Sequence, residues 1–390
     1  MADVTICIPA WQAEPFIERT LNCARAQTHD KIRILVSIDH SVDSTEAICR
    51  SQAQLDPRID VRVQKERLGW SENSNLLLDQ VDTEFCFLYF HDDIIEPTYT
   101  ERLRQQLLDH PDAQSAHCDI ERFGNQQGLH PGVDVEGTTI ERLIKLLVGP
   151  VAGAPLRSLF RSELIAKGLR FPLIGGDSFW RCQPFLMKLI VAGPTRRVPE
   201  ILYRRWIRDG GITRTWNPTE QDALAEGQHE SARLCLDLIR SLHLPRAEEE
   251  VVKFCQYVSV MTQTRKIEMR LESDRLIEPE VICESFGTVQ LPRNTSSIDP
   301  KLLDLILRAY GKLLFIEAKH AWQHGRQQSA LLGFATAFSL NPSLPGAPAT
   351  LVSILDAAGQ TQGAAAVRQR ARVVRQRARV MKALKDRPAN

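Results

Sequence analysis

The 390-residue sequence lacks an excess of charge of either sign, since 49 Lys and Arg face 48 Asp and Glu and leave a net charge of +1. A chain without a basic excess has no general attraction for nucleic acid, so we expect no nucleic-acid partner. The sequence also lacks an apolar run of the ~18 residues that a membrane-spanning helix needs. Its first residues, MADVTI, lack the basic and apolar segments of a signal peptide. These absences predict a cytoplasmic protein.

Closely spaced cysteine pairs are absent as well, although the chain has nine cysteines. None stands in a CxxC pair, and most lie in apolar runs such as VTICIP and FCFLYF. Buried free thiols in a reducing compartment explain these cysteines better than disulfides or a zinc site. The length of the chain predicts two or three domains.

The first hundred residues alternate short apolar runs with helical patterns. The strand-like runs are residues 4–9, 32–38, 59–63 and 85–90. The helical patterns are residues 14–27, 43–53 and 70–81. Continuous apolar runs separated by helices predict an α/β fold with a mostly parallel sheet that is covered on both faces.

Acidic residues follow two of the expected strands. Asp39 directly follows residues 32–38, and His91, Asp92 and Asp93 follow residues 85–90. Ligands of open α/β sheets bind at the carboxyl ends of the strands. Adjacent carboxylates at that edge suit a divalent cation that bridges phosphates. The alternative is that these acids only form loops and cap helices.

The segment from residue 4 to residue 45 resembles the opening of the family 2 glycosyltransferases, which have the GT-A fold. The matching or nearly matching positions are Pro9, Ala10, Trp11, Gln12, Gln27, Thr28, Asp39, Ser41, Asp43 and Thr45. Ile38 and His40 depart from the family, which has an aspartate and a glycine there. The resemblance implies that Asp39 contacts the base or ribose of a nucleotide.

The same resemblance assigns the rest of a donor site. It implies that Pro9, Ala10 and Trp11 lie beside the nucleotide-diphosphate sugar. Asn75 joins them, because LGWSENSNLLL resembles the start of the family's next helix, with Gly69 at the matching glycine.

His91, Asp92 and Asp93 stand where the family keeps its DxD metal motif, but Phe90 replaces the first aspartate. The resemblance implies that Asp92 binds the donor and that Asp92 and Asp93 hold Mn²⁺ or Mg²⁺ with one ligand fewer than usual. His91 is either a substitute ligand or a residue outside the metal's coordination shell.

Two segments further along the chain extend the match to about residue 215. In FPLIGGDSFW, Asp177 falls at the family's general base toward the acceptor hydroxyl, and Gly176 replaces the preceding acid. VPEILYRRW matches the family's next strand after an interval that predicts an insertion near residues 182–185. Arg208 then stands where the family often has a histidine. A guanidinium cannot bind a cation but can clamp diphosphate oxygens, or it is simply a surface arginine.

The remaining sequence predicts helices at residues 220–242, 247–271 and 300–315, with a linker at 279–299. Small residues then recur at tetratricopeptide offsets and again 34 residues later. These positions are Gly325, Ala330, Ala337 and Pro342, then Gly359, Ala364 and Ala371. We therefore expect three regions: a GT-A domain at 1–218, a helical region with linker at 219–298, and tetratricopeptide-like helices at 299–390.

The end of the chain is strongly basic. VRQRARV occurs twice in succession, at residues 367–373 and 374–380, and residues 363–390 carry a net charge of +8. The rest of the chain therefore carries −7. Three alternatives stay open for this amphipathic helix: packing on its neighbours, attachment to anionic lipid at the inner face of a membrane, or contact with a partner or second subunit.

These features predict an inverting glycosyltransferase that moves a sugar from a nucleotide diphosphate to a glycan, lipid-linked or protein acceptor. Bacterial surface polysaccharide or lipopolysaccharide synthesis is the usual setting of such proteins, by analogy of fold alone. The alternative is a non-catalytic GT-A module that binds a partner protein through its helical end. A nucleotidyltransferase is disfavoured, because no glycine-rich, basic phosphate loop follows residues 4–9.

Overall fold

The computed structural model describes residues 2–151, 154–174, 179–208, 221–271, 286, 291–292, 295–357 and 361–385. The chain divides into two compact units. The sheet unit comprises Met1–Leu146, Pro150–Val252 and Leu276–Thr288, and the helical unit comprises Leu147–Gly149, Lys253–Arg275 and Val289–Asn390. The predicted boundaries at residues 218 and 298 stay predictions. Within the described ranges, the helices are too short or too polar to span a bilayer.

The strands of the sheet unit are β1 (Val4–Ala10), β2 (Ile32–Ile38), β3 (Ile59–Val63), β4 (Phe85–Leu88), β5 (Ile94–Ile95), β6 (Ser115–Gly124), β7 (Gly128–His130), β8 (Leu159–Arg161) and β9 (Thr195–Ile207). Its helices are α1 (Ile17–Arg25), α2 (Thr45–Leu55), α3 (Trp70–Leu78), α4 (Tyr99–Asp109), α5 (Thr139–Val148), α6 (Glu163–Ala166), α7 (Cys182–Ala192) and α8 (Gln221–Ser241). Two short 3₁₀ helices, η1 (Ala154–Arg157) and η2 (Phe179–Arg181), complete the unit. The long helix α9 (Arg246–Leu271) contributes residues to both units.

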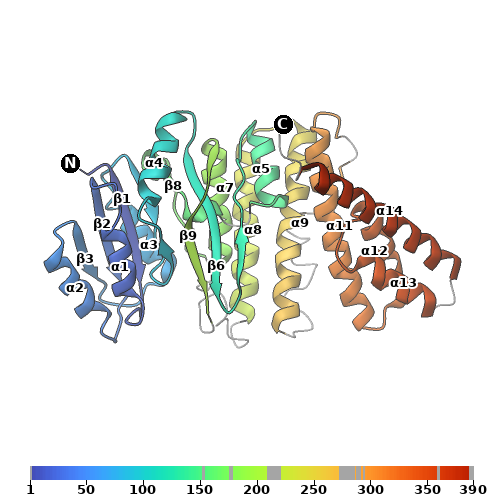
Figure 1. Ribbon diagram of the computed structural model, residues 1–390, viewed down its shortest axis with the longest axis horizontal. Helices are drawn as coiled ribbons and strands as arrows, with labels where there is room; N and C mark the ends of the chain where they lie inside the picture. Colours follow the sequence, from blue (N-terminus) through green and yellow to red (C-terminus); the bar gives the residue numbers. More distant parts are fainter. Residues whose placement is uncertain are drawn as a thin grey trace. The chain divides into compact units, whose positions relative to one another are not determined.

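The described strands form one mixed sheet in the order β3-β2-β1-β4-β8-β6-β9-β5, with β7 paired to β6 (Figure 1). β1 pairs in parallel with β2 and β4, and β6 pairs in parallel with β9. β8 is antiparallel to both β4 and β6, so β4 and β6 run in the same direction. The carboxyl ends of β1, β2, β4, β6 and β9 therefore meet at one edge of the sheet. This confirms the predicted α/β, mostly parallel architecture.

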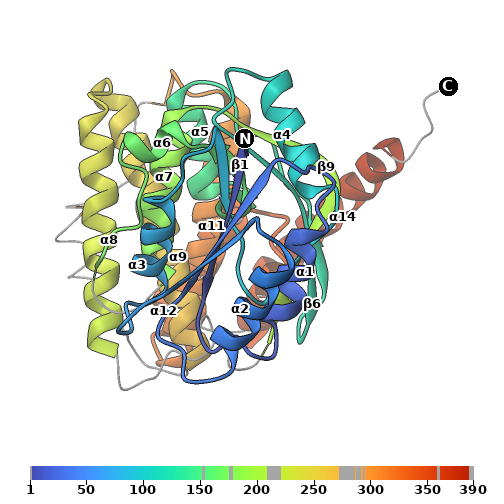
Figure 2. The ribbon, with the colours of Figure 1, turned by 90° about the vertical axis from the view of Figure 1, so that its left-hand side faces the viewer.

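Alternate residues of β1 enter two separate cores, as the two-residue period of a strand requires. Ile6 and Ile8 pack with residues of α1 and α4, whereas Cys7 packs with residues of α3 and α7. Figure 2 shows the same division, with α1, α2 and α4 on one side of the strands and α3, α7 and α8 on the other. All seven residues of β1 are buried, and its run VTICIPA is apolar except for Thr5, whose hydroxyl bonds with that of Thr83.

Several element boundaries differ from those expected, and for two of them the structure shows the cause. The first helix begins at Ile17 rather than at residue 14, because the backbone before it binds side chains of the loop after β2. β4 ends at Leu88, because the chain turns at Phe90 and Asp93. Residues 182–185, where an insertion is expected, form the first turn of α7, and the insertion itself stays a prediction.

The helical unit contains α11 (Pro300–Gln323), α12 (Gln327–Leu340), α13 (Ala347–Ala357) and α14 (Thr361–Lys385). Four alanines at the predicted repeat positions are buried in its core: Ala330, Ala337, Ala364 and Ala371. Small side chains there let neighbouring helices approach closely, as the repeat predicts. The tetratricopeptide assignment itself stays a prediction.

The duplicated basic segment lies on α14, which is one continuous helix. Its first half packs within the unit, because Ala371 is buried and Arg368 forms an ion pair with Asp356 of α13. Arg370 also lies over the ring of Phe338 on α12. These contacts favour the first of the three predicted alternatives for that half of the helix.

Candidate functional site

The loop after β1 is fastened to the loop after β2. Three backbone N–H groups of the first loop donate to two side chains of the second loop and to that of Thr45, the first residue of α2. The bonds run from Gln12 N to Ser41 Oγ at 2.9 Å, Ala13 N to Thr45 Oγ1 at 2.8 Å, and Glu14 N to Asp43 Oδ2 at 3.0 Å. The serine, aspartate and threonine that carry the family resemblance therefore hold the loop that follows Trp11.

Asp39 lies at the end of β2 with only 1% of its surface exposed. Its two carboxylate oxygens accept the backbone N–H groups of Leu68, at 2.6 Å, and Gly69, at 2.9 Å. Gly69 has a φ of 84°, a conformation that glycine adopts without strain, and α3 starts directly after it. Asp39 therefore fixes the entry to α3, and its predicted contact with a nucleotide stays a prediction.

Pro9, Ala10 and Trp11 lie where β1 ends, as expected. The carbonyl oxygen of Pro9 lies 3.1 Å from Nδ1 of His91, and that of Ala10 accepts the N–H of Asp39 at 2.8 Å. The end of β1 thus joins both acidic loops through its backbone. The guanidinium of Arg67 lies 3.5 Å from the centre of the Trp11 ring, a cation–π arrangement.

Asn75 clamps the chain in front of the segment that contains Asp177. Its side-chain nitrogen donates to the carbonyl of Phe171 at 2.9 Å, and its oxygen accepts the N–H of Phe171 at 3.0 Å. This reciprocal pair makes Asn75 a positioning residue, and its assignment to the donor site stays a prediction. Asp177 itself lies outside the described residues.

Asp92 lies on a turn that is held from two sides. Arg19 of α1 donates to the carbonyl of Asp92 at 2.8 Å, and Thr20 donates to the carbonyl of His91 at 2.7 Å. The carboxylate of Asp92 forms an ion pair with Nε of Arg208 at 3.2 Å. Arg208 lies over the ring of Phe16, 4.6 Å from its centre. The structure thus brings together Asp92 and Arg208, which are far apart in the sequence.

Asp93 is buried behind this turn, with 2% of its surface exposed. One carboxylate oxygen accepts the hydroxyl of Tyr203 at 2.7 Å and lies 3.4 Å from Nε of Arg157, and the other accepts the N–H of Trp206 at 2.9 Å. Burial raises the pKa of Asp93, whereas the positive charge of Arg157 acts in the opposite direction. Both oxygens are thus engaged inside the protein.

These contacts bear on the predicted metal ligands. Asp93 directs its oxygens toward Tyr203, Trp206 and Arg157, and Asp92 faces the cationic Arg208. In the part of the chain that is described, no three His, Cys, Asp or Glu side chains group as metal ligands would. This donor set does not fit a resident divalent cation. The assignment of Mn²⁺ or Mg²⁺ to Asp92 and Asp93 stays a prediction that these contacts do not support.

Arg157 and Tyr203, the partners of Asp93, are not among the site residues expected from the sequence. Arg157 belongs to η1, and its guanidinium lies 5.4 Å from the centre of the Tyr203 ring. Tyr203 lies in the matched segment VPEILYRRW, but nothing in that segment points to Asp93. The separation of both residues from Asp93, by 64 and 110 positions, hides the contact until the chain is folded.

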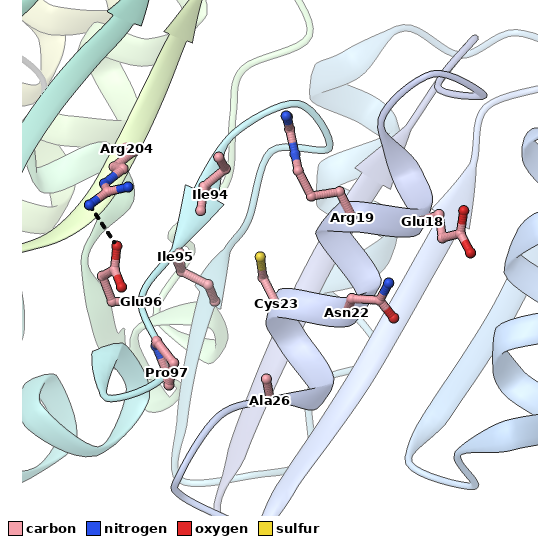
Figure 3. A pocket seen from close by; sticks show the side chains of 10 residues that line it. All are labelled: Glu18, Arg19, Asn22, Cys23, Ala26, Ile94, Ile95, Glu96, Pro97 and Arg204. Carbon is pink, nitrogen blue, oxygen red and sulfur yellow. Dashed lines mark ion pairs between the residues drawn. The ribbon is translucent and has the colours of Figure 1, made fainter.

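An open hollow of about 600 Å³ lies beside this region, between α1 and β5. Figure 3 shows its lining, where Arg19 and Cys23 come from α1 and the ion pair of Glu96 with Arg204 lies across from them. The hollow includes none of the predicted site residues.

Comparison with known proteins finds a family that part of the chain is similar to. Residues 5–153 match the family model described as "Glycosyl transferase family 2". This range contains the expected donor positions Pro9, Ala10, Trp11, Asp39, Asn75 and Asp92 but ends before Asp177 and Arg208.

Curated relatives cover a similar part of the chain. The glycosyltransferase GlyA of Streptococcus pneumoniae is 22% identical over 251 residues, which are 60% of this chain and 35% of GlyA. EpsH of Bacillus subtilis, also named as a glycosyltransferase, is 28% identical over 176 residues, or 44% of this chain and 51% of EpsH. The chain thus spans between about a third and a half of the length of these relatives.

Among solved structures, S. aureus TarS residues 1–349 in complex with UDP-GlcNAc matches 96% of this chain and 92% of its own. The TM-score is 0.56 and the identity 16%. This likeness shows the fold. It confirms the GT-A-like sheet followed by a helical C-terminal region.

Proposed function

We propose that the chain, whose residues 5–153 match glycosyl transferase family 2, transfers a sugar from a nucleotide-diphosphate donor to an acceptor hydroxyl. The fold of TarS, which was crystallised with UDP-GlcNAc and with UDP, makes UDP-sugars the first donors to test. The acceptor is a glycan, a lipid-linked molecule or a protein. Surface polysaccharide synthesis, on the inner side of a bacterial membrane, is the setting that we propose.

The observation that carries this proposal is the meeting of three loops at the carboxyl edge of adjacent strands. β2, β1 and β4 are neighbours in the sheet, and their ends bring Asp39, Trp11 and Asp92 to one place. The backbone of Pro9 and Ala10 ties these loops together. Ligands of open α/β sheets bind at this edge, so a nucleotide has a rigid platform there.

The chemistry of an inverting transfer needs two functions from the chain. A base must take the proton of the acceptor hydroxyl as its oxygen attacks the anomeric carbon, and positive charge must stabilise the departing diphosphate. We assign the first function to Asp177 through its resemblance to the family base. We assign the second to Arg208, whose guanidinium is held beside the turn of Asp92 and suits diphosphate oxygens.

The positive charge that stabilises the diphosphate can come from Arg208 or from a divalent cation at Asp92, and chelation distinguishes these two sources. If Arg208 supplies the charge, transfer continues after chelation with EDTA. If Mn²⁺ or Mg²⁺ bound at Asp92 is needed, EDTA abolishes transfer and either ion restores it.

The test is a donor screen followed by two variants. Wild-type chain is assayed for release of nucleoside diphosphate from UDP-, GDP- and dTDP-sugars, and of CMP from CMP-sugars, with and without Mn²⁺. Asp177→Asn should reduce turnover by a factor of about 10² or more while the donor still binds. Arg208→Gln should lower turnover at least about tenfold, because the charged contact with the leaving group is lost.

Arg246→Gln is the matched control for Arg208→Gln, since Arg246 is an exposed arginine of α9 whose one ion pair within the described ranges is with Glu250 of the same helix. It should leave turnover unchanged. Absence of binding to every nucleotide sugar, with and without Mn²⁺, would overturn the enzymatic proposal in favour of a partner-binding module.

A further inference from the structure

Two arginines stand side by side at the same edge of the sheet. Arg122 lies near the carboxyl end of β6 and Arg205 near that of β9, and the two are register partners in the parallel pair. Adjacent strands lie ~4.8 Å apart, so the two side chains leave the sheet close together and on one face. Both residues are half-buried.

Neither arginine side chain has an ion pair or a hydrogen bond among the described residues, although Asp93 attracts Arg205 electrostatically. The other arginines on or just after β9 all have carboxylate partners. These pairs are Arg196 with Glu136 and Asp112, Arg197 with Asp119, Arg204 with Glu96 and Glu121, and Arg208 with Asp92. Arg205 is therefore the one arginine of this group whose side chain has no carboxylate partner among the described residues.

A third guanidinium adds to the imbalance. Arg157 is buried and its charge is offset by Asp93, which lies 3.4 Å away. The repulsion from Arg157, followed by burial, lowers the pKa of Arg205 to about 10. Burial, followed by repulsion from Arg157, lowers the pKa of Arg122. Among the described residues, Asp93 thus offsets the charges of Arg157 and Arg205 only in part, and no acid offsets that of Arg122, so positive charge is left over.

Such an arrangement costs stability, because like charges opposite each other on neighbouring strands repel and burial strengthens the repulsion. A ligand with two negative charges would remove the cost. Phosphate carries that charge, and its oxygens match the paired N–H groups of guanidinium. A neutral glycan would leave both charges unbalanced.

We propose that Arg122 and Arg205 form a binding site for a phosphate group of a substrate. The group comes either from the diphosphate of the donor or from a phosphate carried by the acceptor, and both would reach this edge of the sheet. That the phosphate belongs to a substrate rests on the proposed function. The binding of phosphate itself does not.

Calorimetric titration of the full chain tests the site. The probes are inorganic phosphate, glycerol 3-phosphate and UDP, with glycerol as the neutral control. Arg122→Gln and Arg205→Gln should each weaken phosphate binding about tenfold or more, because each removes a charged hydrogen-bonding group. Arg204→Gln, the adjacent arginine that already has two carboxylate partners, should change the affinity less than about twofold.

The probes also distinguish the two sources. A loss confined to UDP identifies the donor diphosphate, and a loss for glycerol 3-phosphate with unchanged UDP affinity identifies an acceptor phosphate. If all three probes bind the Arg122→Gln/Arg205→Gln double variant as tightly as the wild type, the site does not exist. Binding is measured without turnover, so a negative donor screen would not affect this result.

Thermal unfolding without ligand supplies a second readout. Because repulsion between the two guanidiniums destabilises the free protein, Arg205→Gln should raise the midpoint of unfolding while it weakens phosphate binding. A lower midpoint would show that Arg205 stabilises the fold and would contradict the proposal.

Discussion

The acidic loops after β2 and β4 and the arginine pair on β6 and β9 lie at one edge of the same sheet, yet they differ in how their charges are met. Asp39 and Asp93 have both carboxylate oxygens bound by protein donors, and Asp92 faces Arg208. Arg122 and Arg205 have no such partners among the described residues.

This difference separates two uses of charge. The buried acids order the loops, because every one of their oxygens takes a donor from another segment of the chain. The arginines do not order anything in the free protein, and their charge is available to a ligand. A charged residue at a sheet edge is therefore a binding candidate to the extent that the fold leaves it unpaired.

Of the substitutions proposed for these regions, removal of the charge of Asp93 should lower the free energy of unfolding most. In Asp93→Asn, Arg157 becomes a buried cation without its counter-charge, so the free energy of unfolding should fall by about 3 kcal/mol or more. Urea unfolding followed by circular dichroism measures the change.

Asp92→Asn is the control for this loss, since it removes a carboxylate at the neighbouring position. The side chain of Asp92 is 21% exposed, so its pair with Arg208 should be worth less than about 1 kcal/mol. Equal losses in the two variants would contradict the structural role that we give to Asp93.

His117 is a second basic residue of β6, the strand of Arg122, and is buried. Unlike Arg122, it is neutral at pH 7 in the folded protein. Burial, opposed by the charges of Asp134 and Asp119, lowers the pKa of His117 from 6.5 to about 4. Between these values the unfolded chain binds a proton that the folded chain does not, so stability falls as the pH is lowered. The loss should approach about 3 kcal/mol from pH 7 to pH 4.

Urea unfolding at a series of pH values measures this slope, and His117→Leu supplies the reference, because it lacks the titrating group. The difference in stability between wild type and His117→Leu should change through this pH range and become constant above it. A difference that is the same at every pH would show that His117 keeps its ordinary pKa.

The sequence was informative about these regions to different degrees. The apolar runs before Asp39 and Asp92 were enough to predict the strands, and the common direction of those strands predicted that the two acids would meet. The period of a strand also separates Arg204 from Arg205 on opposite faces of β9. The partners could not be predicted, because Tyr203 and Arg157 reach Asp93 only through the tertiary packing of β9 and η1.

Sequence motifs also do not predict the role of a residue whose side chain binds the backbone of a distant segment. Asn75 matched a family position and was assigned to the donor, but in the structure its amide group binds the backbone of Phe171. A motif fixes which residue stands at a position, and the neighbouring segment decides what its side chain binds.

The smallest loss of stability is expected at Asn75, whose two hydrogen bonds with the backbone of Phe171 involve no charged group. Asn75→Leu removes both hydrogen bonds to Phe171 and leaves its N–H and carbonyl without their partner, so the free energy of unfolding should fall by about 1–3 kcal/mol. Asn75→Asp keeps the acceptor and loses the donor, so its loss should be smaller. Asn22→Leu, at an exposed position of α1, is the control for the substitution itself and should be close to neutral. If the clamp also positions the segment that leads to Asp177, Asn75→Leu lowers kcat and leaves the affinity for the donor unchanged, whereas a direct contact with the donor would weaken that affinity first.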